Sequence, residues 1–318
     1  MKTTLRNTAI KTIAALSLAF TGSQAFAAGN ATVSVVNDEL RIVGDGSAND
    51  IKVEQTVVNR YRVTGLAGTK VNGRNSDVFR VKKGIRADLK NGDDTLRIQG
   101  EFFGILSDNI DGPLTVDMGL GSDKVILDFL NINGRTSINT GDGPLDTVQV
   151  FAVASVESSF SIVTGNGKDN VSLSVLQVDN GLDVFTQDGD DTVKILNTEA
   201  DFISLDTGKG RDLVTTEFST SASDWEIDTG SEDDTLEMKN CSAILSMGIA
   251  TRDGDDEVSL TNVEGQALVV LMGDDDDHLI LTDVVFDDAS VDGENDDNLL
   301  VLEGNNEIND FTVENFDQ

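Results

Sequence analysis

Apolar and polar residues alternate over most of the chain, and the alternation restarts at regular intervals. After Asp169, for example, apolar Val171 and Leu173 alternate with Ser172 and Ser174. A period of two is typical of a β-strand with one buried face. The chain has ten equivalent aspartates, and most of them are followed by apolar residues two and four positions later. These aspartates are Asp94, Asp123, Asp146, Asp169, Asp191, Asp212, Asp234, Asp256, Asp277 and Asp297. The sequence therefore predicts a strand after each of them.

The spacing of these aspartates predicts how the strands are arranged. Successive gaps are 29, 23, 23, 22, 21, 22, 22, 21 and 20 residues, a period of about 22 after the first gap. A fixed period in this range is typical of a solenoid, in which each unit stacks on its neighbours. The residues two positions after the aspartates are Leu96, Val125, Val148, Val171, Val193, Val214, Leu236, Val258, Leu279 and Leu299. We therefore expect an all-β solenoid with about 22 residues per coil, in which equivalent strands stack in parallel.

A glycine-rich turn leads into most of these strands. It is written most fully as Gly-x-Gly-x-Asp at residues 119–123, 165–169 and 208–212. Stacking places equivalent carboxylates ~4.8 Å apart, where like charges repel by roughly 1 kcal/mol in water and by more at a protein surface. Calcium binds 6–8 carboxylate and carbonyl oxygens in flexible geometry, so a row of Ca2+ would relieve this repulsion.

The predicted calcium ligands are therefore Asp94, Asp123, Asp146, Asp169, Asp191, Asp212, Asp234, Asp256 and Asp277, with Gly119, Gly121, Gly165, Gly167, Gly208 and Gly210 in the turns. Glycine suits such a turn because it readily adopts positive φ. The alternative is that Asp and Gly act only as turn formers, with carboxylates accepting hydrogen bonds from backbone N–H groups. The sequence leaves both interpretations open.

The turns resemble the hemolysin-type (RTX) calcium-binding repeats, and the longer period resembles exported bacterial right-handed parallel β-helix proteins. The resemblance covers roughly residues 32–303 and implies a right-handed parallel β-helix with calcium held between stacked turns. The chain departs from the RTX pattern because it has one turn per coil instead of a motif every nine residues. It also replaces the first glycine with Lys90, Gln187 or Arg252, replaces the second with Glu232 or Asp275, and inserts Pro144 before Asp146.

Residues 1–27 have the three parts of a secretory signal. Basic residues come first, an apolar run follows at residues 13–20, and Ala25-Phe26-Ala27 supplies a cleavage site. The apolar run is far shorter than the ~20 residues that span a bilayer. We expect cleavage after Ala27 and a periplasmic, cell-surface or extracellular protein with no transmembrane segment in the mature chain.

Three further segments complete the expected domain organisation. Residues 28–86 are expected to form an N-terminal β-hairpin cap, with one hairpin turning at Asn37-Asp38 and a second at Val58-Asn59. Residues 87–303 are assigned to the β-helix coils, with an irregular insertion between Glu101 and Pro113. Residues 304–318 are expected to cover the last coil, because an open end would expose core and unpaired strand edges.

Charge and rare residues exclude several function classes. The chain has 57 acidic and 23 basic residues, a formal charge of -34, which repels phosphate backbones and excludes nucleic acid as a partner. Cys241 and His278 are the only cysteine and histidine. A zinc site built from several Cys or His is therefore excluded. Cys241 shares the phase of apolar residues in other coils, so we expect it in the core.

The predicted function is that of an exported, calcium-stiffened structural or adhesive protein, with a cell-surface glycan or protein as its possible partner. A first alternative is a polysaccharide-active lyase or glycoside hydrolase, with Lys168, Lys209 or Arg211 as the base beside the Asp row. A second is a glycan-binding face made of Thr95, Thr147, Thr192 and Thr235. No coil has a distinct constellation, so no catalytic residue is assigned.

Overall fold

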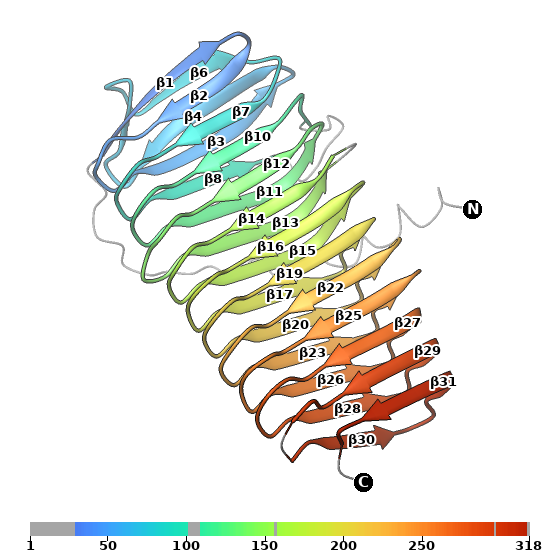
Figure 1. The fold of residues 1–318 in the computed structure, drawn as a ribbon. Helices are drawn as coiled ribbons and strands as arrows, with labels where there is room; N and C mark the ends of the chain where they lie inside the picture. The colour runs from blue at the N-terminus through green and yellow to red at the C-terminus, as the bar shows by residue number, and fades with distance from the viewer. Residues whose placement is uncertain (1–28, 101–108, 156–157, 296, 317–318) are drawn as a thin grey trace.

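A computed structural model describes residues 29–100, 109–155, 158–295 and 297–316. Within these ranges the regular elements are all β-strands, and they stack into one elongated solenoid (Figure 1). Each coil takes about 22 residues and pairs in parallel with the coils on either side. The predicted fold class, an all-β parallel solenoid, is confirmed.

Two long rows of strands form the main faces of the solenoid. The entry row precedes the Gly/Asp turns and contains β2 (Glu39–Val43), β7 (Ile85–Asp88), β10 (Leu114–Asp117), β12 (Thr136–Asn139), β14 (Phe160–Val163), β16 (Gly181–Phe185), β19 (Phe202–Asp206), β22 (Asp224–Asp228), β25 (Ser246–Ala250), β27 (Glu264–Leu271), β29 (Val285–Asp292) and β31 (Glu307–Glu314). The exit row follows the turns and contains β3 (Asp50–Val57), β8 (Thr95–Gln99), β11 (Lys124–Ile132), β13 (Thr147–Ser155), β15 (Asn170–Val178), β17 (Thr192–Leu196), β20 (Leu213–Glu217), β23 (Thr235–Lys239), β26 (Glu257–Thr261), β28 (His278–Thr282) and β30 (Leu299–Glu303).

A third, less regular side closes each coil. Its short strands are β9 (Asn109–Ile110), β18 (Glu199–Ala200), β21 (Thr220–Ser221) and β24 (Ser242–Ala243). In the other coils, the long exit strands β11, β13 and β15 continue into this side, or the long entry strands β27 and β29 begin in it.

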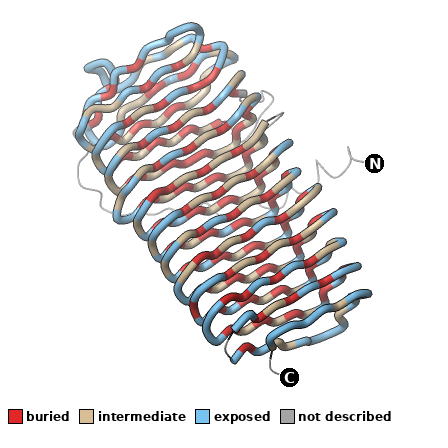
Figure 2. Tube along the Cα trace, viewed as in Figure 1, coloured by how far each residue is buried: buried red, intermediate tan, exposed pale blue. Residues whose placement is uncertain are grey.

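The core runs along the inside of the stack, because alternate side chains of each strand point inward (Figure 2). In β15 and β17, for example, Val171 is paired with Val193 and Leu173 with Ile195, and all four are fully buried. Cys241 is 1% exposed and belongs to this core, as predicted. The alternation seen in the sequence thus gives one continuous hydrophobic column.

At the N-terminal end, both predicted hairpins are present. β1 (Asn30–Val36) and β2 are antiparallel, and the turn between them has positive φ at Asn37 (53°) and Asp38 (68°), as type I′ turns require. β3 and β4 (Arg60–Leu66) form the second hairpin. Two further strands, β5 (Lys70–Val71) and β6 (Ser76–Arg80), pair with β1 and β4.

These hairpins are also part of the stack. β2 pairs in parallel with β7, and β3 pairs in parallel with β8. The reason is that inward-facing residues of β2 and β3 alternate in the same phase as those of the later coils. Parallel stacking therefore begins before residue 87, where the sequence analysis placed its start.

At the C-terminal end, one prediction is wrong by one residue. Leu279 is paired with Leu300, so the residue equivalent to Asp277 is Asn298 and not Asp297. Leu299 is accordingly 47% exposed, whereas Leu300 packs against the core. The run from 299 to 302 is apolar throughout, so alternation could not fix its phase.

Two predictions fall on residues that the structure does not describe. The signal segment at residues 1–27 is one, and most of the insertion between Glu101 and Pro113 is the other. In the described part of the chain, no helix is long and apolar enough to cross a membrane.

Candidate functional site

The nine predicted aspartate ligands do lie in one row, but they face the interior of the solenoid. None is more than 3% exposed. The backbone N–H of each donates to Oδ1 of the equivalent residue in the next coil, at 2.7–2.9 Å. We call this the inner row; its members are Asn49, Asp94, Asp123, Asp146, Asp169, Asp191, Asp212, Asp234, Asp256, Asp277 and Asn298.

An asparagine occupies each end of the inner row, and the sequence analysis missed both. The N–H of Asn49 donates to Asp94 Oδ1 at 2.5 Å. At the other end, Asn298 Oδ1 accepts from the N–H of Asp277 at 2.7 Å, and its Nδ2 donates to the carbonyl of Gly293 at 2.6 Å. Both asparagines precede apolar residues at positions two and four, and this signal would have identified them.

The second oxygen of each inner-row carboxylate is enclosed. Oδ2 has no hydrogen-bond partner in any of the nine aspartates. In the central coils, a buried threonine hydroxyl lies beside the carboxyl group, as Thr207 does beside Asp212. Thr207 Oγ1 uses its only proton on the carbonyl of Thr229, at 2.9 Å. Its lone pairs can therefore take a hydrogen bond from Asp212 only if that carboxyl group is protonated.

Burial raises the pKa of the whole row, because a charged carboxylate loses hydration inside the protein. In several coils, repulsion from neighbouring carboxylates adds to this effect. The pKa rises to about 8 at Asp123 and Asp234, to about 6 at Asp146, and it is also raised at Asp169. The pKa rises to about 7 at Asp94, Asp191, Asp212, Asp256 and Asp277. Neutral carboxyl groups therefore suit this row in mildly acidic conditions.

Calcium would have to compete with hydrogen bonds that already occupy most of the oxygens around the turns. The carbonyl of Gly208 accepts from the N–H of Ser231 at 3.1 Å, and that of Lys209 accepts from the N–H of Gly189 at 2.6 Å. The carbonyl of Asp212 accepts from the next coil at 2.9 Å. Of the two oxygens of each inner-row carboxylate, Oδ2 is the one left unbonded, whereas calcium takes 6–8 oxygens. The described residues also contain no group of three or more His, Cys, Asp or Glu that could hold a metal ion.

At the six glycines predicted in the turns, the backbone has positive φ and the turns stack closely. All have positive φ, between 85° at Gly165 and 142° at Gly167; the other four are Gly119, Gly121, Gly208 and Gly210. A Cβ at Gly119 would lie 1.1 Å from the carbonyl oxygen of Lys90 in the preceding coil. Positive φ persists where glycine is replaced, at Lys90, Gln187, Glu232, Arg252 and Asp275. In these coils the turn conformation is therefore kept without glycine, whereas Gly143, in the turn that contains Pro144, does not have positive φ.

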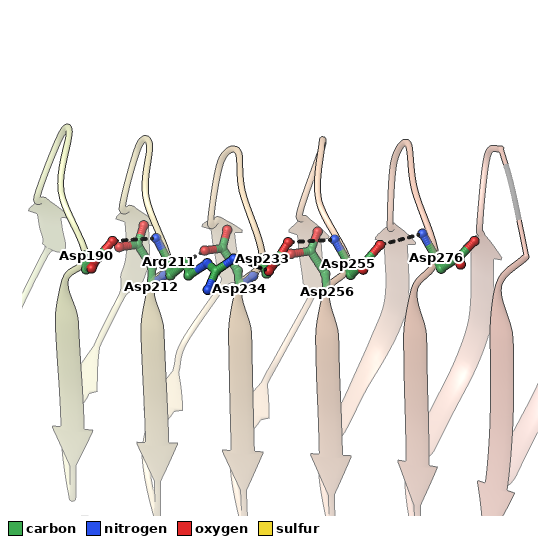
Figure 3. A network of polar contacts seen from close by, with 8 residues as sticks. All are labelled: Asp190, Arg211, Asp212, Asp233, Asp234, Asp255, Asp256 and Asp276. Carbon is green, nitrogen blue, oxygen red and sulfur yellow. Dashed lines mark hydrogen bonds and ion pairs between the residues drawn. The ribbon is translucent and has the colours of Figure 1, made fainter.

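A second hydrogen-bonded row lies on the outer side of the turns, one residue before the inner row. In this outer row, the N–H of Asp255 donates to Asp233 Oδ1 at 3.3 Å, and the N–H of Asp276 donates to Asp255 Oδ1 at 3.1 Å (Figure 3). Each donor belongs to the later coil, so the direction is opposite to that of the inner row. The Asp-Asp doublets of the sequence, as at 233–234 and 255–256, were the available signal.

The three basic candidates of the enzyme hypothesis lie on the outside of the turns. Lys168 is 4.0 Å from Asp190, Lys209 is 3.3 Å from Asp188, and Arg211 is 2.8 Å from Asp233. Their side chains are 65–70% exposed, and exposed ion pairs of this kind contribute about 0–1 kcal/mol. Their partners are exposed aspartates, whereas the inner-row carboxylates are buried. No acid–base constellation is therefore formed by these three with the inner row.

The chain matches no protein-family model, no curated protein and no solved structure.

Proposed function

We propose that the protein is a rigid rod of stacked coils that acts outside the cytoplasm as a structural or adhesive element. The observation that supports this proposal best is the continuity of the inner row. One type of hydrogen bond, 2.5–2.9 Å long, repeats at ten steps from Asn49 to Asn298. At ~4.8 Å per step, the row spans roughly 48 Å.

The repetition favours a mechanical role because each coil is held to the next in the same way. Parallel backbone pairing joins the entry and exit rows, and the inner and outer rows clamp the turns between them. A hinge would need a step where these contacts are weaker. A rod of this kind suits a protein that must hold a fixed length or present one face to a glycan or protein partner.

Export is supported by the sequence of residues 1–27, with its basic start, apolar run and Ala25-Phe26-Ala27 cleavage site. The resemblance to exported right-handed β-helix proteins points the same way. The high negative charge also suits a protein that must stay soluble at a crowded surface.

Calcium binding by the inner row is a separate part of the proposal. A deprotonated row would carry nine buried negative charges, and a cation between coils would neutralise them. Calcium would gain Oδ2 as a ligand in each coil but would need further oxygens from the turns. Binding is therefore expected only where the carboxyl groups are ionised, and its cost is the loss of some hydrogen bonds between turns.

The test of the exported rod begins with the full chain expressed in a bacterium. The expected result is protein in the periplasm, at the cell surface or in the medium, with Ala28 as its first residue. Electron microscopy or small-angle scattering should then show a rod. As a matched variant, deletion of residues 191–211 removes one whole coil and should shorten the rod by ~4.8 Å without unfolding it. Retention inside the cell with residues 1–27 intact would contradict export.

The role of the exported rod needs its own measurement. Cells that carry the chain should attach to glycan-coated or protein-coated surfaces, or resist lysis, better than cells without it. Purified protein should release no new reducing or unsaturated ends from acidic or neutral polysaccharides. Release that is lost in Lys209→Ala would favour the polysaccharide-active enzyme instead.

A further inference from the structure

Charge is distributed very unevenly along the rod. Residues 60–97 contain ten basic and four acidic side chains, and they form strands at the N-terminal end of the stack. The last 66 residues, 253–318, contain 21 acidic and no basic side chains. The two ends of the solenoid therefore carry opposite charge, although the chain as a whole is strongly acidic.

The strands at the C-terminal end have open edges. β30 pairs only with β28, and β31 pairs only with β29, within the described residues. The side chains at this end are acidic, and those of Glu303, Asp310 and Glu314 are exposed and form no ion pair among the described residues. Open edges of this kind attract other strands unless charge or covering prevents it.

The N-terminal end has a complementary character. β6 is an edge strand that pairs only with β4 in the described part of the chain. Around it lie Arg60, Arg80 and Lys82, which are exposed and form no ion pair among the described residues. Figure 1 places β6 and the last strands, β30 and β31, at opposite ends of the rod.

The hydrophobic core also comes to the surface at these two ends. Its fully buried members run the length of the stack, but the apolar side chains that are only partly buried against it belong to β6 or to the C-terminal segment. They are Phe79 at the N-terminal end and Leu300, Ile308, Phe311 and Phe316 at the C-terminal end. Val78 in β6 and Leu302 in β30 are 47% and 51% exposed. Apolar area that remains uncovered at both ends favours contact between them.

We propose that copies of this chain associate head to tail, with the acidic C-terminal end of one copy against the basic N-terminal end of the next. The contact is heterologous, so copies can add in one direction and build a filament along the rod axis. Two acidic ends repel each other, and two basic ends do the same, which leaves the opposite end of another copy as the matching surface. The proposal rests on the ends of the solenoid and does not depend on export or adhesion.

Total charge does not prevent this contact at physiological salt. The Debye length is then about 8 Å, so only charges near the contact act across it, while the -34 of the whole chain is largely screened. At very low salt the total charge should oppose association, and at 1 M salt the attraction between the ends should be screened. Association through the ends is therefore expected to be strongest at intermediate salt.

The test uses two charge-reversal variants of the full chain. The first is Arg60→Glu, Arg80→Glu and Lys82→Glu at the N-terminal end, and the second is Glu303→Lys, Asp310→Lys and Glu314→Lys at the C-terminal end. A matched control, Lys168→Glu, Lys194→Glu and Lys209→Glu, makes the same charge change as the first variant at exposed positions along the middle of the rod. Circular dichroism checks that each variant is folded.

Sedimentation over a range of concentrations at ~0.15 M salt measures the association. The parent chain and the mid-rod control should both increase in mean mass as concentration rises. Each end variant alone should associate more weakly than the parent chain, because the first leaves residues 60–97 with no net positive charge and the second places three lysines at the exposed C-terminal end. An equimolar mixture of the two end variants should associate again, since each offers the end that the other lacks. A parent chain that remains monomeric up to its solubility limit, or association unchanged by both end variants, would overturn the proposal.

Discussion

The backbone N–H of Asp277 donates to the side-chain amide oxygen of Asn298, whereas every earlier step of the inner row ends on a carboxylate oxygen. An amide at this position accepts the hydrogen bond through Oδ1 and donates through Nδ2, and it carries no charge. Like a protonated aspartate, it offers an acceptor oxygen on one atom and a donor on the other. Asn298 therefore shows that a neutral side chain can occupy a position of the inner row.

This relationship predicts the effect of substitutions in the central coils. Asp212→Asn should keep the hydrogen bond from the N–H of Asp191, now at 2.7 Å, and remove a buried charge. It should raise the melting temperature strongly at pH 8 and less at pH 5. Asp212→Ala removes the same charge but leaves the buried N–H of Asp191 without an acceptor, so it should be less stable than Asp212→Asn by about 1–3 kcal/mol at both pH values. The measurement is thermal unfolding of the parent chain and the two variants at pH 5 and pH 8. An Asp212→Asn variant that is less stable than the parent at pH 8 would contradict the prediction.

The stability of the whole protein should depend on pH in a direction set by the inner row. Folding raises the pKa of eight of these carboxyl groups from about 3.8 to between about 6 and 8, and it also raises the pKa of Asp169. The folded state therefore holds protons that the unfolded state releases, and this contribution is complete below pH 4 and lost as pH rises through 6 to 8. The melting temperature should fall between pH 5 and pH 8.5 at constant salt. A double variant, Asp123→Asn with Asp234→Asn, should show a smaller fall, and a flat or rising profile in the parent would contradict protonation of the row.

Calcium and protons should compete if calcium binds at the inner row. At pH 8, calcium in hundredfold excess over its dissociation constant should stabilise the fold by about 2.7 kcal/mol per site, and chelator should reverse the gain. At pH 5 both effects should be small because the carboxyl groups are protonated. Asp169→Ala should reduce the calcium effect, and Asp38→Ala, in the turn between β1 and β2, should not. If calcium stabilises the protein equally at both pH values, the ion binds at the outer row. The same conclusion follows if Asp233→Asn and Asp255→Asn abolish the stabilisation by calcium.

A second corner of the coil makes an independent prediction about strain. Residues there have positive φ in successive coils from Phe129 to Gly304, including Val175 at 56° and Asn197 at 49°. A β-branched residue is disfavoured in this conformation, and asparagine tolerates it well. Val175→Asn should stabilise the protein by about 1 kcal/mol, and Asn197→Val should destabilise it by a similar amount. Denaturant unfolding of both variants is the measurement; two changes of the same sign would mean that packing outweighs backbone strain at this corner.

The fold was predictable because the sequence has two clear periods. The period of about 22 residues gives the length of a coil, and the period of two identifies the strands within it. The inward position of the aspartates was also within reach: Asp169 has the same phase as Val171 and Leu173, so alternation places all three on the inner face. The sequence analysis estimated the repulsion of these carboxylates as if they lay at a protein surface and missed this consequence. What pattern alone does not reveal is the partner of each oxygen, since that depends on how the backbone of one turn lies against the next.

Elsewhere the pattern itself was ambiguous. The prediction aligned the last coil with the others one residue too early. Four successive apolar residues, from Leu299 to Leu302, fit either phase of the alternation. The outer row was missed because its members vary in type, from Asp93 to Arg211 to Asp276. The hydrogen bond there joins a backbone N–H of one residue to a side chain of another. The donor position can therefore hold almost any residue type, and only the acceptor position is recognisable in the sequence.

The inner row has a consequence for how such a chain can change in evolution. Each central aspartate is hydrogen-bonded, through its N–H and its Oδ1, to its equivalents in the coils after and before it, and this bond is the same at every step. Loss or duplication of the segment between two equivalent aspartates therefore joins surfaces that already fit. Length becomes a trait that recombination can adjust in increments of one coil, while the two asparagine ends stay unchanged.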